Sequence, residues 1–124
     1  MILGTVLSAK NILAGHLNDK VRGTLAYKIM KFIHEVEVEE RFSNAEIPKI
    51  LEKYAEKDSD GKLVYEDGGY KIPPENIDKF QAEIDALHNT EVESPRVSFI
   101  LGDFEDLSVS ANEMWILSQF MKED

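Results

Sequence analysis

The fold of this chain is constrained most by a stripe of apolar residues that recurs every three or four positions after Lys20. The stripe consists of Val21, Leu25, Ile29, Phe32 and Val36, and it is widened by Ala26, Met30 and Ile33. Such spacing places apolar side chains on one face of an α-helix. We therefore expect a long helix from Lys20 to about Phe42, with the later helices packed against it as a spine.

Two interpretations fit the sequence after Phe42. Residues 43–46, Ser-Asn-Ala-Glu, match a capping box, and Pro48 suits a first helical turn, so we expect a second helix to begin near Asn44. The alternative is a single long helix that is kinked at Pro48. In both cases the Asp-Ser-Asp-Gly run at 58–61 is expected to end the helix.

Shorter elements are expected on both sides of the spine helix. Ser8 is a candidate N-cap for a short helix over 8–17. Two β-prone runs around a Gly-rich turn predict a small hairpin at about 62–72. Pro73 and Pro74 close this hairpin, and apolar residues at helical spacing predict the next helix over 75–88.

The last third of the chain is expected to add one strand and one helix. Residues 97–101 look like a short strand, and 103–107 like a loop or turn. Ser110 and Glu113 match a capping box that opens a last helix. The predicted fold class is therefore α+β and mainly helical, with four or five helices, in a single domain over 1–124.

Charge is distributed unevenly along the 124 residues, whose net charge is −10. Residues 1–34 hold five bases and one acid, whereas residues 75–124 hold three bases and twelve acids. Direct nucleic-acid binding is disfavoured, because that affinity comes from Lys and Arg at phosphates. The early bases are Lys20, Arg22, Lys28 and Lys31. We expect them to pair with the acidic C-terminal half of the same chain; the alternative is an acidic partner.

The acidic C-terminal half also supplies the candidate residues for binding a protein partner. They are Glu91, Glu93, Asp103, Glu105, Asp106 and Trp115. Trp115 belongs to a group with Met114, Phe120 and Met121, whose helical spacing favours the core. Any member of this group that stays exposed would suit a protein interface.

One segment approaches a metal-binding motif. Glu56, Asp58, Asp60, Gly61, Leu63 and Asp67 fall at positions 1, 3, 5, 6, 8 and 12 of an EF-hand calcium loop. Position 1 is the bulkier Glu, position 12 is the shorter Asp, and the Gly- and Pro-rich residues 68–74 cannot supply the exit helix. An acidic turn is the preferred interpretation, so no metal or cofactor is expected.

Catalytic motifs are not found in the sequence. The chain has no cysteine, and His16, His34 and His88 are scattered without the spacing of a zinc site. No phosphate-binding glycine motif or nucleophile-elbow motif occurs. We expect no enzyme, although a hydrolytic site assembled only in three dimensions stays open.

Several short motifs, in order, resemble a family of small uncharacterised bacteriophage proteins. They lie at 53–62 (KYAEKDSDGK), 70–77 (YKIPPENI), 87–93 (LHNTEVE) and 103–114 (DFEDLSVSANEM). The resemblance covers about 20–121, apart from 43–48. It implies a phage or prophage origin and a small accessory role. No catalytic residues are assigned in that family, so the resemblance transfers none to this chain.

The expected function is therefore non-enzymatic and depends on protein–protein contacts. A virion or assembly accessory of the tail or connector region is the first expectation, with a possible homo-oligomer. The alternative is an acidic inhibitor of a host nucleic-acid-binding enzyme or defence system, which imitates a phosphate backbone. Both place the protein in the host cytoplasm or the virion, without a membrane.

Overall fold

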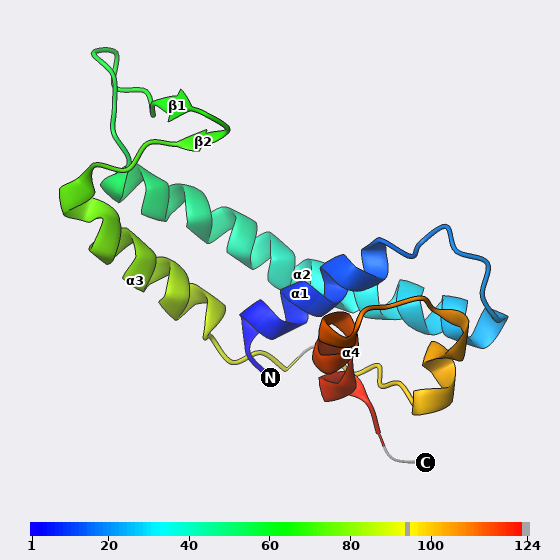
Figure 1. The fold of residues 1–124 in the computed structure, drawn as a ribbon. Coiled ribbons are helices and arrows are strands. Elements are labelled where there is room, and N and C mark those ends of the chain that lie inside the picture. Colours follow the sequence, from blue (N-terminus) through cyan, green and yellow to red (C-terminus); the bar gives the residue numbers. More distant parts are fainter. Residues whose placement is uncertain (94, 123–124) are drawn as a thin grey trace.

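The expected spine helix is present, and in the computed structural model it is one unbroken element, α2, from Gly23 to Tyr54 (Figure 1). The structure describes residues 1–93 and 95–122. Buried positions repeat along one side of α2 at Leu25, Ile29, Phe32, Val36, Ser43 and Ile50. With 32 residues the helix is about 48 Å long, so its two halves pack against different parts of the chain.

The expected break before Pro48 is wrong, and the single-helix alternative is correct. Pro48 lies on the solvent-exposed side of α2, as do Asn44 and Ala45. The carbonyl of Asn44, which loses its helical partner because proline has no N–H, is therefore accessible to water. Burial of Ser43 and Ile50 on the opposite side holds the helix together across this position.

The N-terminal half of α2 belongs to the body of the molecule. Three elements complete the body: α1 (Leu3–Ala14), the 3-10 helix η2 (Leu101–Asp106) and α4 (Ala111–Leu117), which is followed by the 3-10 helix η3 (Ser118–Phe120). α1 packs against both α2 and α4. The centre of the body is aromatic, because Phe32 lies 5.7 Å from Phe99 and 5.1 Å from Phe120 between ring centroids.

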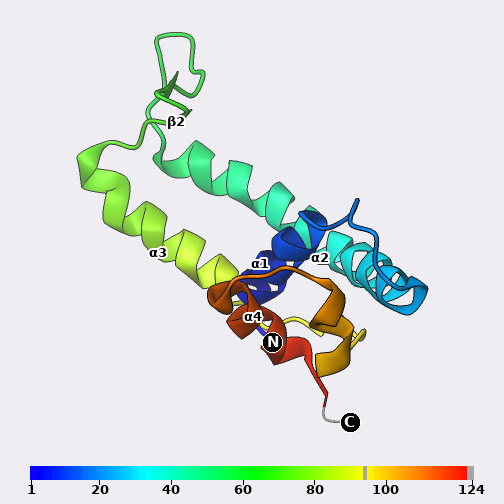
Figure 2. The same ribbon diagram turned by 45° about the vertical axis from the view of Figure 1, so that its right-hand side comes forward.

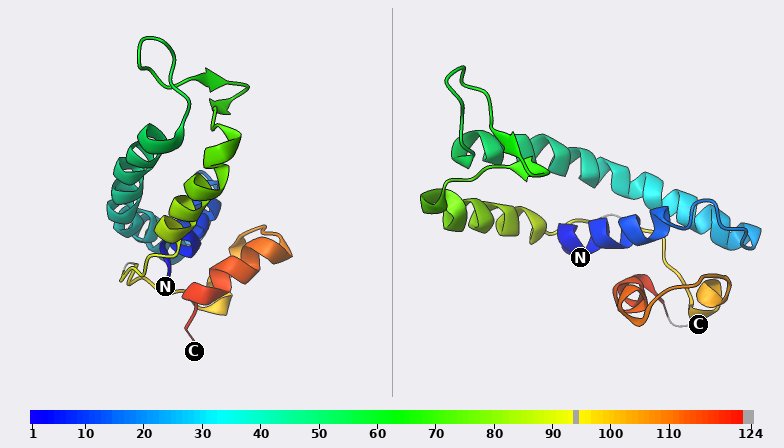
Figure 3. Two further views of the ribbon diagram at one scale, coloured as in Figure 1. Left: turned by 90° about the vertical axis from the view of Figure 1, so that its left-hand side faces the viewer. Right: turned by 45° about the horizontal axis from the view of Figure 1, so that its top comes forward.

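The C-terminal half of α2 forms an arm together with α3 (Ile77–His88), which the 3-10 helix η1 (Pro74–Asn76) precedes. The two helices run side by side in each view (Figures 2 and 3). A small second core of Leu3, Ile50 and Leu87 joins the arm to α1. The predicted helix over 75–88 is thus confirmed.

The outer end of the arm is the segment between α2 and η1, which carries the predicted hairpin. Strands β1 (Tyr65–Glu66) and β2 (Gly69–Tyr70) are antiparallel, with Tyr65 opposite Tyr70. Their turn needs two left-handed residues, Asp67 at φ 51° and Gly68 at φ 84°. The mainly helical α+β class is therefore confirmed. Among the described residues, no helix is long and apolar enough to cross a membrane.

Several expected boundaries differ from the structure. α2 ends at Tyr54, before the Asp-Ser-Asp-Gly run at 58–61, and α1 ends at Ala14 and not at 17. α1 begins at Leu3 and not at Ser8, because the first free amide, that of Leu3, donates to the carbonyl of Thr90 at 2.8 Å. Residues 97–101 form a single parallel bridge, between Phe99 and Met121, in place of a strand. The amide of Phe99 donates to Phe120 O at 2.9 Å, so this segment is held by the chain end and not by a sheet.

Truncating the central ring of the body tests this description. Phe32→Ala removes a side chain that is 0% exposed, and it is expected to lower the free energy of unfolding by about 3–5 kcal/mol. Urea unfolding followed by circular dichroism measures the change. Tyr65→Ala, which truncates a 63% exposed ring at the arm tip, should cost about 1 kcal/mol or less. Equal losses for the two variants would contradict the assignment of the core.

Candidate protein-interaction site

Among the described residues, Trp115 is the most exposed large hydrophobic residue, with 74% of its surface accessible. A capping box fixes the start of its helix, α4. Glu113 N donates to Ser110 Oγ at 3.1 Å, and Ser110 N donates to Glu113 Oε1 at 2.9 Å. This start directs Leu117 into the core and leaves Trp115 outside. The aromatic and methionine group is therefore divided, since Phe120 is buried and Met114 and Met121 pack against the core.

A groove lies beside Trp115, with a volume of about 580 Å³. Its lining includes Ile2, Leu7, Asn11, His88, Trp115 and Ile116. Gly4 lets α1 approach the end of α3 here, because a Cβ at Gly4 would lie 3.2 Å from both the Cβ and the carbonyl oxygen of His88. We call this surface the Trp115 groove. An exposed tryptophan beside a partly apolar groove is the composition that protein interfaces favour.

The same groove brings together side chains of the kinds that hydrolytic sites use. Thr5 and Ser8 bring hydroxyl groups to it, and His88 brings an imidazole. No hydrogen bond joins His88 to either hydroxyl in the part of the chain that the structure describes, and none of the lining residues is a carboxylate. A nucleophile, a base and an orienting acid are thus not brought together.

Three of the candidate carboxylates form an intramolecular charge cluster with Arg22, just before α2, and with Lys28 in its first turns. Lys28 Nζ donates to Asp103 Oδ2 at 2.7 Å, and Arg22 Nε donates to Asp106 Oδ2 at 2.7 Å. Glu105 lies 3.8 Å from the same arginine. We call Arg22, Lys28, Asp103 and Asp106 the charge clamp, because it fastens η2 to the beginning of α2. The expected pairing of the early bases with the C-terminal half is confirmed for Arg22 and Lys28.

The two clamp carboxyls differ in their surroundings. Asp103 is only 8% exposed. Its burial raises the pKa of the carboxyl, but hydrogen bonds from Lys28 and from the Ile100 amide outweigh burial and hold that pKa below its usual value. Asp106 is more accessible, and the hydrogen bond from Arg22 is the main cause of its lowered pKa. Both carboxylates are therefore held in the charged form within the molecule.

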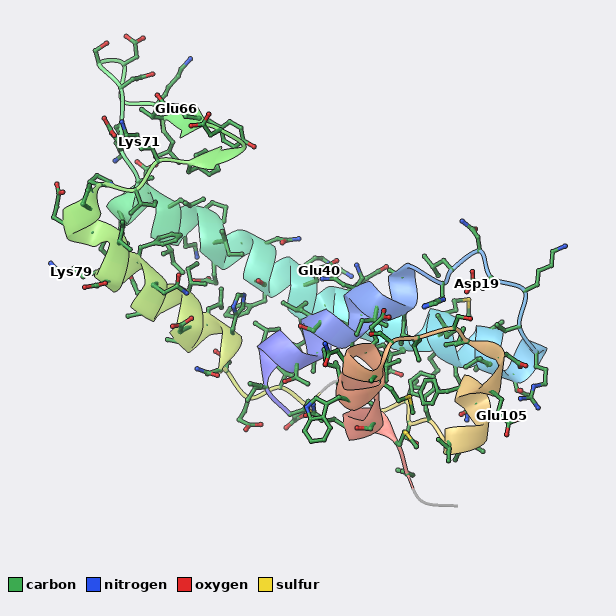
Figure 4. All side chains as sticks on the ribbon, in the orientation of Figure 1. Asp19, Glu40, Glu66, Lys71, Lys79 and Glu105 are labelled. Carbon is green, nitrogen blue, oxygen red and sulfur yellow. The ribbon has the colours of Figure 1, made fainter. Side chains whose placement is uncertain are left out.

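The remaining two candidate carboxylates lie after α3. Glu91 accepts from the amino group of Met1 at 3.0 Å, and Glu93 is exposed. The six candidates are thus divided between three parts of the chain, namely η2, α4 and the segment after α3. Figure 4 shows Glu105 on η2, far from the labelled residues Glu66 and Lys71 at the arm tip.

The acidic segment at 56–67 folds as a turn. Asp58 Oδ1 accepts from the backbone amides of Asp60 and Lys62 at 2.9 and 3.0 Å, so its carboxylate stabilises the loop itself. Glu56 pairs with Lys71 at 3.4 Å. Among residues 1–93 and 95–122, no three His, Cys, Asp or Glu side chains are grouped closely enough to hold a metal ion.

Sequence reasoning missed a set of exposed apolar residues on the other side of α2. They are Tyr27, Met30, Val38 and Phe42, which are 47–59% exposed. Their helical periodicity could have revealed them in the sequence. These residues also recur every three or four positions or at multiples of that spacing, on the side of the helix about half a turn away from the buried stripe. The expectation that Met30 and Ala26 widen the apolar stripe is wrong, because both are exposed. Two exposed rings at the arm tip were missed as well, Tyr65 and Tyr70, which stack edge to face with centroids 5.1 Å apart.

Neutralising the buried clamp carboxylate tests the clamp. Asp103→Asn leaves Lys28 without its charged partner, and it is expected to lower the free energy of unfolding by about 3 kcal/mol at pH 7. Chemical denaturation measures the loss. Glu105→Gln is the matched control, because Glu105 is exposed and 3.8 Å from its arginine, and it should leave stability nearly unchanged.

The stability difference between the wild-type protein and Asp103→Asn is also expected to depend on pH. The folded state holds the pKa of Asp103 below that of the unfolded chain, so its contribution is present above about pH 4 and is lost as pH falls through the folded pKa. The difference in stability between the wild-type protein and Asp103→Asn should therefore shrink below about pH 4. A difference that stays constant from pH 7 to pH 3 would contradict an ionised Asp103.

Comparison with known proteins does not assign this geometry to a family. No family model, no curated protein and no solved structure matches the chain.

Proposed function

We propose that the protein is a non-enzymatic phage protein that works by binding other proteins, as a virion or assembly accessory. The observation that carries the proposal is the exposure of Trp115 beside the groove between α1, α3 and α4. A tryptophan with three quarters of its surface in water gains much apolar burial when a partner covers it. The phage origin is supported by the sequence resemblance alone.

The shape of the molecule also suits an assembly role. The arm of α2 and α3 extends from the body and ends in the hairpin segment (Figure 2). Strands β1 and β2 of this segment carry the exposed pair Tyr65 and Tyr70. Apolar or aromatic residues are thus exposed at the body and at the arm tip, which are separate parts of the molecule. An accessory protein that joins two neighbours needs at least two such surfaces.

The charge clamp makes the inhibitor alternative less favoured. A phosphate mimic must present free carboxylates, yet Asp103 and Asp106 are hydrogen-bonded to bases of the same chain. Their charge is largely compensated inside the molecule before any partner arrives. Exposed carboxylates remain on the arm and at Glu93, so a basic partner is a distinct outcome of the experiment below.

Affinity purification from infected cells, followed by mass spectrometry, tests the proposal. The wild-type protein is expected to recover virion or assembly proteins, and Trp115→Ala should recover at least about tenfold less of them. Leu101→Ala is the matched control, because Leu101 is an exposed apolar residue, at 65%, on η2 and outside the lining of the Trp115 groove. Its recovery should equal that of the wild-type protein.

Two results would contradict this proposal. Recovery of a basic host nucleic-acid-binding protein, with binding that weakens as salt rises above about 0.1 M, would favour the inhibitor alternative. Equal recovery with Trp115→Ala and with the wild-type protein would show that the Trp115 groove is not the contact surface. Urea unfolding of Trp115→Ala, expected to match the wild-type curve closely, shows that any loss of binding is local.

A further inference from the structure

The solvent side of α2 carries a second apolar face, in addition to the one buried in the body. Tyr27, Met30, Val38 and Phe42 form this outer face, and each has about half or more of its surface exposed. His34 lies among them with 83% of its side chain exposed. Four large apolar side chains at helical spacing on a solvated face are unusual for a helix that has no further partner.

A cavity of about 540 Å³ opens beside the N-terminal part of this face. It lies between α2 and the segment 97–98, and its walls include Gly23, Thr24, Tyr27, Lys31, Val97 and Ser98. Lys28, which is a member of the charge clamp, also lines it. Such a cavity can receive an aromatic ring. Lys28 is already paired with Asp103, so Lys31 is the lining base that favours an acidic surrounding for that ring.

Phe42 supplies the complementary feature on the same side of the helix. It follows Thr24 by 18 residues, which is five turns of α-helix, so the two side chains project in the same direction. The distance along the helix is about 27 Å, so Phe42 cannot reach the cavity of its own chain. Residues 26 and 42 lie eight positions on either side of His34, and residue 26 falls within the stretch 23–31 whose residues help to line the cavity.

We propose that two copies of this chain pair through α2 in antiparallel orientation, with a two-fold axis near His34. This axis places residue 42 of one copy opposite residue 26 of the other, so that each Phe42 enters the cavity of its partner. The same pairing sets Met30 against Val38 twice. The contact is self-complementary and closed, which is the form that most homodimers take.

Charge selects the antiparallel orientation. The N-terminal part of α2 and the residues before it carry Lys28 and Lys31 but no acid between positions 20 and 34. Residues 35–46 instead hold five acids and one base, Arg41, and two of the acids, Glu39 and Glu46, lie about one turn from Phe42 on either side. Antiparallel pairing therefore brings bases to acids at both ends. Parallel pairing would bring like charges together and leave both cavities about 27 Å from the nearest Phe42.

Sedimentation velocity over protein concentrations from about 1 µM to about 1 mM tests the dimer. The wild-type protein is expected to shift from monomer to dimer across this range. Phe42→Ala should weaken dimerisation at least about 30-fold, because it removes the ring that fills each cavity. Tyr65→Ala, which removes an exposed ring at the arm tip, is the matched control and should dimerise like the wild-type protein.

Cysteine cross-linking tests the orientation, and the chain contains no cysteine that would interfere. His34→Cys, next to the two-fold axis, should form a disulfide-linked dimer under mild oxidation. Tyr27→Cys alone should not, since position 27 faces position 41 of the partner. A mixture of Tyr27→Cys and Arg41→Cys should form the mixed dimer. Ser59→Cys, on the arm, gives the background rate.

Each contrary result has a clear meaning. A wild-type protein that stays monomeric up to the highest concentration would overturn the proposal. A dimer that Phe42→Ala leaves intact would exclude this interface. Self-linking of Tyr27→Cys above the Ser59→Cys background would indicate parallel pairing and would overturn the antiparallel arrangement. Because the cross-links are compared between variants of the wild-type helix, they do not depend on how well Phe42→Ala folds.

Discussion

The packing of Phe32 against Phe99 and Phe120 is the contact on which the rest of the body depends. The segment from 95 to 122 contains only short helices and single bridges, so it has little regular structure of its own to hold it. The rings attach it to the middle of α2, and the charge clamp fastens η2 to the beginning of the same helix. Hydrophobic burial supplies most of this attachment, and the ion pairs fix its position.

Periodicity is local, and therefore the features that depend on it could be predicted from the sequence. The buried stripe of α2, the helix over 75–88 and the capping box at Ser110 all follow from residues within one or two turns of each other. The break before Pro48 could not be judged in this way. Whether proline ends a helix depends on which side faces water and what is buried opposite, and both are tertiary properties.

The site was harder to predict because its parts come from distant segments. The start of α1 depends on the carbonyl of Thr90, and the Trp115 groove depends on the close approach of Gly4 to His88. Opposite charges in the two ends of the chain indicated that they would pair, and they do at Arg22 and Lys28. Nothing in the pattern indicated that this pairing would use carboxylates which had been assigned to a partner, namely Asp103 and Asp106.

The two proposed surfaces reinforce each other if both are correct. The Trp115 groove lies on α4, which packs on α1, whereas the outer face of α2 lies opposite the buried stripe that α1 covers. One copy can therefore use both surfaces at once.

A dimer through α2 would carry two Trp115 grooves and two arms related by a two-fold axis. Paired grooves bind a repetitive target more tightly than either groove alone, because the second contact is intramolecular once the first has formed. A virion or an assembly intermediate presents the same binding site many times. Dimerisation would therefore strengthen the contact between the Trp115 groove and such a partner, which a single exposed tryptophan supports only weakly.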